Sequence, residues 1–199
     1  MEGNNKYNPF IPIADNLSGA LFIFLFLFVV LAILPKFQAQ FQEKKTMENI
    51  KKDFRKYENN GYITVSVKEN SIMIHDVDFS LGSSCVKPDY LDVINNIASK
   101  IKQILDKNKN LTILIDGHSD ANKITVPVVK SCGGFFTNNM QLSTLRAMEV
   151  RNIIINRIGK SYESRIGVAG YGDTRLLDKN NPYSPKNRYV NIKFVWRAL

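Results

Sequence analysis

The feature that most constrains this chain is an apolar stretch near its N-terminus. From Leu17 to Leu34 it is interrupted only by Ser18 and Gly19. As a helix the stretch would be roughly 27 Å long, close to the ~30 Å hydrocarbon core of a bilayer. The residues before it include one lysine and two prolines, and no small-residue cleavage site follows, which argues against a cleaved signal peptide. We therefore predict a retained membrane-spanning helix within residues 15–35.

An acidic residue, Asp15, stands at the leading edge of this stretch. On a helix, Asp15, Ser18, Gly19 and Phe22 share one face, where small residues let another helix approach closely. Ionisable residues inside membranes usually mark ion or proton paths. The alternative is that Asp15 lies at the membrane interface and caps the helix. The residues of this stretch alone leave both interpretations open.

The distribution of charge gives conflicting indications. Lysines follow the predicted span while its N-terminal side is nearly neutral, so the positive-inside rule would keep the C-terminal part in the cytoplasm. That rule weakens for long translocated domains. The formal net charge of +9 suits an anionic partner such as a nucleic acid, an anionic lipid or a cell-wall glycan. Because no basic block is interleaved with aromatic residues, we do not expect a nucleic-acid partner.

Hydrophobic periodicity after the span predicts an α+β domain. A charged connector that is partly helical leads into an alternating hairpin, and helices and strands follow in turn. The predicted elements are a connector 36–61, a hairpin 62–79, a helix 89–105, a strand 111–117, a helix 139–158, and strands 165–172 and 188–196. The expected core face of the first helix is Leu91, Ile94, Ile97, Ile101 and Leu105. The predicted division of the chain is 1–14, 15–35, 36–61 and 62–199.

The two cysteines, Cys85 and Cys132, have neither CxxC spacing nor a histidine cluster, so we expect no metal site. Outside the cytoplasm they would form one disulfide closing a loop of about 45 residues. The alternative is two separate free thiols.

The run His118-Ser119-Asp120 contains residue types found in hydrolases. No nucleophile elbow, oxyanion-hole motif or Gly-rich phosphate loop accompanies it. We therefore expect no enzyme activity, no catalytic residue and no cofactor.

Four ordered motifs resemble the OmpA-like peptidoglycan-binding domain. They are IDGHSD (115–120), NNMQLSTLRAMEVRNIIINRIG (138–159), AGYGDT (169–174) and NRYVNIKF (187–194). The resemblance covers roughly residues 72–196 and implies helices packed on a mixed β-sheet. It also implies that Asp120 and Arg146 bind the amine and the carboxylate of diaminopimelate in the wall peptide, with Asn187 and Arg188 near the same pocket.

This sequence departs from the family pattern in three places. The segment between Asp120 and the LSxxRA motif is long and contains Cys132, the region before Asn187 is short, and Tyr189 replaces a second arginine. The alternative interpretation is a structural Asp120–Arg146 salt bridge in a descendant that has lost binding.

The stretch I-A-D-N-L-S-G (13–19) resembles the start of the span in MotB-type motor subunits. That resemblance implies that Asp15 binds and releases the driving H⁺ or Na⁺, and that a homodimer is surrounded by a ring of MotA-type subunits. It also implies an inner-membrane protein with a cytoplasmic N-terminus and a periplasmic C-terminal domain. The short connector and the long insert resemble the ZorB subunit of Zorya anti-phage systems, whose ring subunit is ZorA. A flagellar stator subunit, a passive wall anchor and a cytoplasmic-facing binding module remain alternatives.

Overall fold

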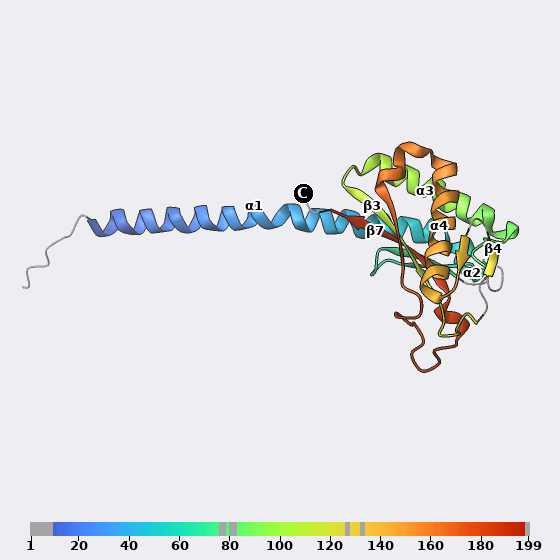
Figure 1. The fold of residues 1–199 in the computed structure, drawn as a ribbon. Helices are drawn as coiled ribbons and strands as arrows, with labels where there is room; N and C mark the ends of the chain where they lie inside the picture. The colour runs from blue at the N-terminus through green and yellow to red at the C-terminus, as the bar shows by residue number, and fades with distance from the viewer. Residues whose placement is uncertain (1–9, 76–78, 80–82, 126–127, 132–133, 198–199) are drawn as a thin grey trace, which may run out of the picture. The chain divides into compact units, whose positions relative to one another are not determined.

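Figure 1 shows the fold in a computed structural model, which describes residues 10–75, 79, 83–125, 128–131 and 134–197. The chain divides into two compact units, Met1–Glu43 and Lys44–Leu199.

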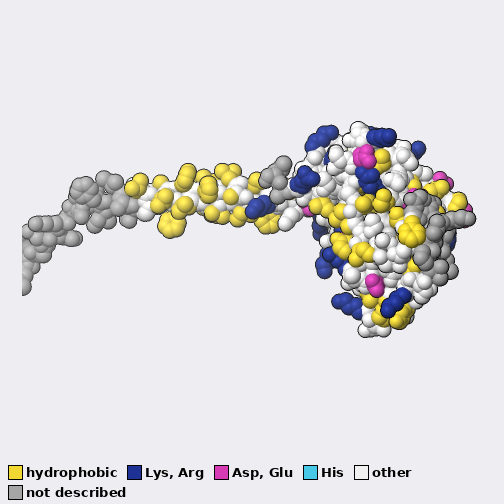
Figure 2. Space-filling model, viewed as in Figure 1, with side chains coloured by type: hydrophobic (Ala, Val, Ile, Leu, Met, Phe, Trp, Pro, Cys, Tyr) yellow, Lys and Arg dark blue, Asp and Glu magenta, His cyan; other side chains and the backbone are white. Residues whose placement is uncertain are grey.

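The first unit consists of most of α1, a continuous helix over Phe10–Asp53. The part from Asn16 onward is long and apolar enough to cross a membrane, and none of its most apolar window is buried within the protein. Phe22, for example, is 75% exposed, and Figure 2 shows apolar side chains along this part of the helix. A helix that is apolar on all sides requires an apolar environment, which a bilayer supplies.

The structure corrects one interpretation of Asp15. Because α1 begins at Phe10, Asp15 lies in the second turn of the helix. A capping residue precedes the first helical residue, so the interpretation of Asp15 as an N-cap is wrong.

The second unit begins inside α1. Met47, Ile50 and Phe54 recur at helical spacing and are buried in the core of this unit. A short helix, α2 (Arg55–Asn59), follows, and Gly61 with a φ of 73° leads the chain into the sheet. The second half of the predicted connector therefore packs as part of the globular unit.

The main sheet has five strands in the order β1-β2-β7-β3-β6. Their bounds are β1 Ile63–Ser66, β2 Ser71–His75, β3 Leu111–His118, β6 Ile166–Gly170 and β7 Tyr189–Trp196. Strands β3 and β6 are parallel, while β1–β2, β2–β7 and β7–β3 are antiparallel. This mixed sheet, with the β1–β2 hairpin at one edge, confirms the predicted fold class.

A second, two-stranded sheet lies in the insert that sequence analysis described only as a long segment. It pairs β4 (Val128–Ser131) with β5 (Gly134–Phe136) in antiparallel fashion. The run of β-branched residues before a Gly-Gly pair was the signal for this hairpin.

The long helices of the second unit are α3 (Leu91–Lys107) and α4 (Asn139–Ile158). Short 3₁₀ turns η2 (Pro88–Tyr90), η3 (Lys160–Arg165) and η4 (Pro185–Asn187) join the elements. The expected core position Leu91 is wrong, because Leu91 is the first residue of α3 and is 38% exposed. The buried face begins at Val93 and Ile94, after the first turn.

Helix α4 lies so close to β3 and β6 that only glycine fits at two contacts. A Cβ on Gly117 would be 1.8 Å from the Ser143 carbonyl oxygen, and one on Gly170 would be 2.0 Å from Thr144 Oγ1. This close approach fixes α4 relative to the C-terminal end of β3, where the predicted site begins.

Candidate peptidoglycan-binding site

Asp120 follows β3 and is held by backbone hydrogen bonds on both sides. The Ser119 amide donates to the Gly172 carbonyl at 2.8 Å, and the Ala121 amide donates to the Pro182 carbonyl at 3.0 Å. Gly172 has a φ of 52°, and its own amide donates to Ser143 Oγ at 2.9 Å. The AGYGDT turn therefore joins α4 to the segment that carries Asp120.

The Asp120 carboxylate forms an ion pair with Arg188. Arg188 Nη1 donates to Asp120 Oδ2 at 2.7 Å, and the Asn122 amide donates to Asp120 Oδ1 at 3.0 Å. Asp120 is only 5% exposed, so this charged pair is largely removed from water. A charge this deeply buried is stabilised by such partners and would be costly without them.

Arg146 lies on α4 and is 2% exposed. Its Nε donates to the Ser83 carbonyl at 3.0 Å, and its guanidinium lies over the Phe79 ring with 5.2 Å to the ring centroid. None of the interactions that Asp120 makes within the described residues involves Arg146. The alternative of a structural Asp120–Arg146 salt bridge is therefore wrong, and the acid and the base are held separately.

The Asn187 side chain is buried and holds the surrounding loop in place. Its Nδ2 donates to the carbonyls of Asp178, Asn181 and Pro182 at 3.0–3.2 Å, and its Oδ1 accepts from the Asp178 amide at 2.8 Å. The residue is 0% exposed. Three carbonyls share its two amide hydrogens, so Asn187 fixes the loop before β7 and thereby the position of Arg188.

A cavity of about 380 Å³ lies at the N-terminal end of α4, beside the Asp120 segment. It is lined by Lys123, Ile124, Thr137, Asn138, Asn139, Met140 and Asp173. Asn139 Nδ2 donates to the carbonyls of Asp120 and Asn122, so one cavity wall is bonded directly to the acid's own segment. Asn138 caps α4 by accepting from the Gln141 amide at 2.9 Å. Sequence analysis did not assign these lining residues to a site, because they come together only when the segment after Asp120 folds back toward it.

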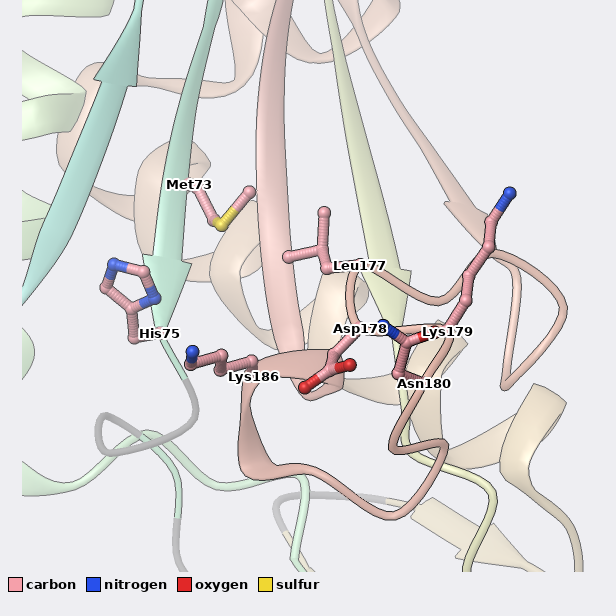
Figure 3. Close-up of a pocket in the computed structure, with 7 residues that line it drawn as sticks. All are labelled: Met73, His75, Leu177, Asp178, Lys179, Asn180 and Lys186. Atoms are coloured by element: carbon pink, nitrogen blue, oxygen red, sulfur yellow. The ribbon is translucent and has the colours of Figure 1, made fainter.

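A larger cavity, of about 700 Å³, lies between β2 and the loop before β7 (Figure 3). Its lining includes Met73 and His75 from the strand, with Leu177, Lys179 and Lys186 from the loop. His75 Nε2 lies 3.0 Å from Thr64 Oγ1 of the neighbouring strand.

Cys132 lies outside the described residues. The Cys85–Cys132 disulfide therefore stays a prediction.

A comparison with family models matches residues 79–189, more than half of the chain, to the OmpA family. A comparison with curated proteins finds no significant match.

Several solved structures share the fold. A putative MotB-like protein from Desulfovibrio vulgaris has a TM-score of 0.60 at 17% identity, covering 79% of this chain and 96% of that one. The cell wall anchor of the type VI secretion system from Pseudomonas aeruginosa has a TM-score of 0.57 at 21% identity, covering 74% and 96%. The periplasmic domain of Helicobacter pylori MotB has a TM-score of 0.51 at 21% identity, covering 64% and 76%.

Proposed function

The chain belongs to the OmpA family, and on that premise we propose that its second unit binds peptidoglycan while α1 anchors it in the bacterial inner membrane. The observation that carries this proposal is the separate placement of a buried acid, Asp120, and a buried base, Arg146, on segments joined through the Gly172 turn. A ligand with both an amine and a carboxylate, such as diaminopimelate, needs such a pair. The protein then acts as a binding and anchoring component and not as an enzyme.

In this site the four predicted residues have different roles. The Asp120 carboxylate receives the ligand's amine, and the Arg146 guanidinium holds the ligand's carboxylate with its planar fork. Arg188 holds the carboxylate of Asp120 in place, and Asn187 fixes the loop that delivers Arg188. The cavity beside Asn139 gives the rest of the wall peptide room next to Asp120.

The test is binding of the purified full chain to isolated peptidoglycan sacculi in a co-sedimentation assay. We expect Asp120→Ala to lower binding at least about tenfold, because one lost charge-assisted contact is worth about 1.5–3 kcal/mol. Asp106→Ala is the matched control, since Asp106 forms an exposed ion pair with Lys102 on α3, away from this site. Wild-type binding by Asp120→Ala would show that the site is placed wrongly.

We further propose that the protein is the wall-anchored subunit of an ion-driven membrane motor. Asp15, inside α1, would carry H⁺ or Na⁺ in a homodimer surrounded by MotA-like or ZorA-like subunits. This places the N-terminus in the cytoplasm and the OmpA-like unit in the periplasm. Of the motor types, we favour the ZorB subunit of an anti-phage defence system because of the short connector and the insert after Asp120.

Asp15→Asn separates the motor from a passive anchor. The neutral amide keeps the size of the side chain but cannot take up and release a proton, so we expect an intact complex whose activity is lost. Asp15→Glu is the control that retains a carboxylate. Activity would be read as protection in a phage challenge and as swimming motility, which distinguishes a defence system from a flagellar stator. Unchanged activity in Asp15→Asn would leave the passive wall anchor as the better interpretation.

A further inference from the structure

A third cavity, of about 580 Å³, lies on the sheet face opposite α4. The strand register pairs His118 with Tyr189 and Leu114 with Lys193, so these residues share a face. Their neighbour Gly117 points the other way, toward Ser143 of α4. The cavity is therefore separated from α4 and Arg146 by the sheet itself.

Two buried polar side chains line this cavity with hydrogen-bonding capacity to spare. His118 is 3% exposed and Asn191 is 5% exposed. His118 Nδ1 and Asn191 Oδ1 have no hydrogen-bond partner among the described residues. Buried polar atoms are nearly always paired in folded proteins, so these two atoms indicate a missing polar partner. Asn191 Oδ1 accepts only, which requires an N–H or O–H from that partner.

The opposite wall of the cavity is formed by the loop before β7 and is cationic. The Arg175 guanidinium lies over the Tyr171 ring with 3.6 Å to its centroid, so its planar group is held against that ring. Among the described residues, neither Arg175 nor Lys179 forms an ion pair. Lys193 differs, because its Nζ lies 2.5 Å from Asp116 Oδ2 and its charge is already balanced.

The His118 ring lies close to the positive charges of Lys193 and Arg175. It stacks on Tyr189 at 4.1 Å and on Tyr171 at 5.3 Å between ring centroids. Burial lowers the pKa of His118 to about 4, and the nearby Lys193 and Arg175 charges add to that effect. At neutral pH the ring is uncharged and offers one donor and one acceptor nitrogen. Glu69 is the one carboxylate in the cavity lining.

We propose that this cavity is a second binding site, distinct from that of Asp120, for a small carboxylate that also carries an N–H group, as an N-acyl amino acid does. The carboxylate pairs with the fork of Arg175, and Lys179 adds a second positive charge. The ligand's N–H donates to Asn191 Oδ1, and His118 supplies a further polar contact. The volume is within the range of small-molecule sites, about 300–1,000 Å³.

The experiment is a titration of the purified full chain in detergent with N-acetyl-D-alanine, followed by the NMR signals of the His118 ring and by calorimetry. We expect saturable binding that shifts the His118 signals. Arg175→Gln should weaken the affinity at least about tenfold, because a bidentate charge-assisted contact is lost. Lys179→Gln should weaken it by a smaller factor. Arg157→Gln and Lys160→Gln are matched controls, because both side chains are exposed and neither lines the cavity.

Three further titrations test which groups of the ligand are needed and whether binding depends on Asp120. N-acetyl-D-alanine amide, which lacks the carboxylate, should not bind, and inorganic phosphate, which lacks the N–H and the planar shape, should bind more weakly. Asp120→Ala should bind the probe as the wild type does. The proposal is overturned by an absence of saturable binding, by wild-type affinity in Arg175→Gln, or by loss of probe binding in Asp120→Ala. Sacculus binding tests the peptidoglycan proposal separately, so failure of one leaves the other standing.

Discussion

Gly117 shows how much of the site depends on a residue without a side chain. It stands in the GHSD motif immediately before His118, and the backbone of α4 occupies the space where a Cβ would project. The contact sets the distance between β3, which leads to Asp120, and the helix that carries Arg146. The glycine therefore helps to set the geometry of the proposed site without contributing a side chain to it.

We expect Gly117→Ala to destabilise the protein by about 3 kcal/mol, at the upper end of the usual cost of overpacking. The added Cβ would meet the Ser143 carbonyl at 1.8 Å, a backbone atom that moves only with the helix. Gly167→Ala is the matched control, because its Cβ would meet Leu114 Cδ1 at an ordinary 3.7 Å on the neighbouring strand. Denaturant unfolding measures both, and equal stability of the two variants would contradict this account.

His118 makes stability depend on pH. Because burial lowers its folded pKa to about 4 from an ordinary value near 6.5, the unfolded chain binds more protons between these values. The contribution is fully present above pH 6.5 and is lost as the pH falls toward 4, by at most about 3 kcal/mol. His118→Gln should flatten the dependence of the unfolding free energy on pH in this window. The chain has two histidines, so NMR titration resolves both, and a His118 pKa near 6.5 would refute the prediction.

At the residue level, sequence reasoning proposed Asp120, Arg146, Asn187 and Arg188 for one site but did not predict the ion pair between Asp120 and Arg188. The motifs identify Asp120 and Arg146 because these positions are fixed by a strand end and a helix face. The pairing of Asp120 with Arg188 joins residues far apart in the sequence, through a loop whose path depends on the amide of Asn187. Local patterns carry no information about such a path, so the ion pair emerged only from the fold.

The elements themselves were largely predictable, because hydrophobic periodicity is a local signal. The predicted helix 139–158 coincides with α4, which has an Asn cap before it and Gly159 after it. The β4–β5 hairpin was missed because its two strands are short. The end of α1 shows the other limit of periodicity. The spacing of Met47, Ile50 and Phe54 predicts a helix but does not say which core that helix joins.

We expect Phe54→Ala to destabilise the second unit by about 3 kcal/mol or more, as for other buried Phe→Ala substitutions. Phe54 is buried among core residues of this unit although it lies next to the end of α1. Phe41→Ala is the matched control, because Phe41 lies in α1 and is exposed. Thermal unfolding of the full chain in detergent compares them, and a similar shift in both variants would mean that Phe54 is not a core residue.

At the scale of the whole molecule, the family and the order of the parts followed from the sequence, since several motifs occur in a fixed order along the chain. The cavities did not, because each is formed by segments that meet only in the folded protein. Two of them lie where the loop before β7 returns across β2 and β7, and share Leu177 and Lys179 in their linings. Met73 and His75 of one cavity pair in register with Asn191 and Tyr189 of the other, so both cavities lie on the same face of the sheet. The same loop carries the hydrogen bonds around Asn187, so one segment shapes both cavities and also positions Arg188.

The hydrogen bonds around the Asn187 side-chain amide limit how this loop can vary among relatives of the protein. The Asn187 amide ties the chain at residues 178, 181 and 182, so the number of residues from Asp178 to Asn187 is fixed by geometry. The stretch from Thr174 to Leu177 lies before the segment that these hydrogen bonds hold. Insertions and deletions that evolution tolerates should therefore accumulate between Thr174 and Leu177, while the spacing from Asp178 to Asn187 stays constant. The residues beside Arg175 can then change, and with them the ligand that the third cavity binds, while the Asp120–Arg188 pair is preserved.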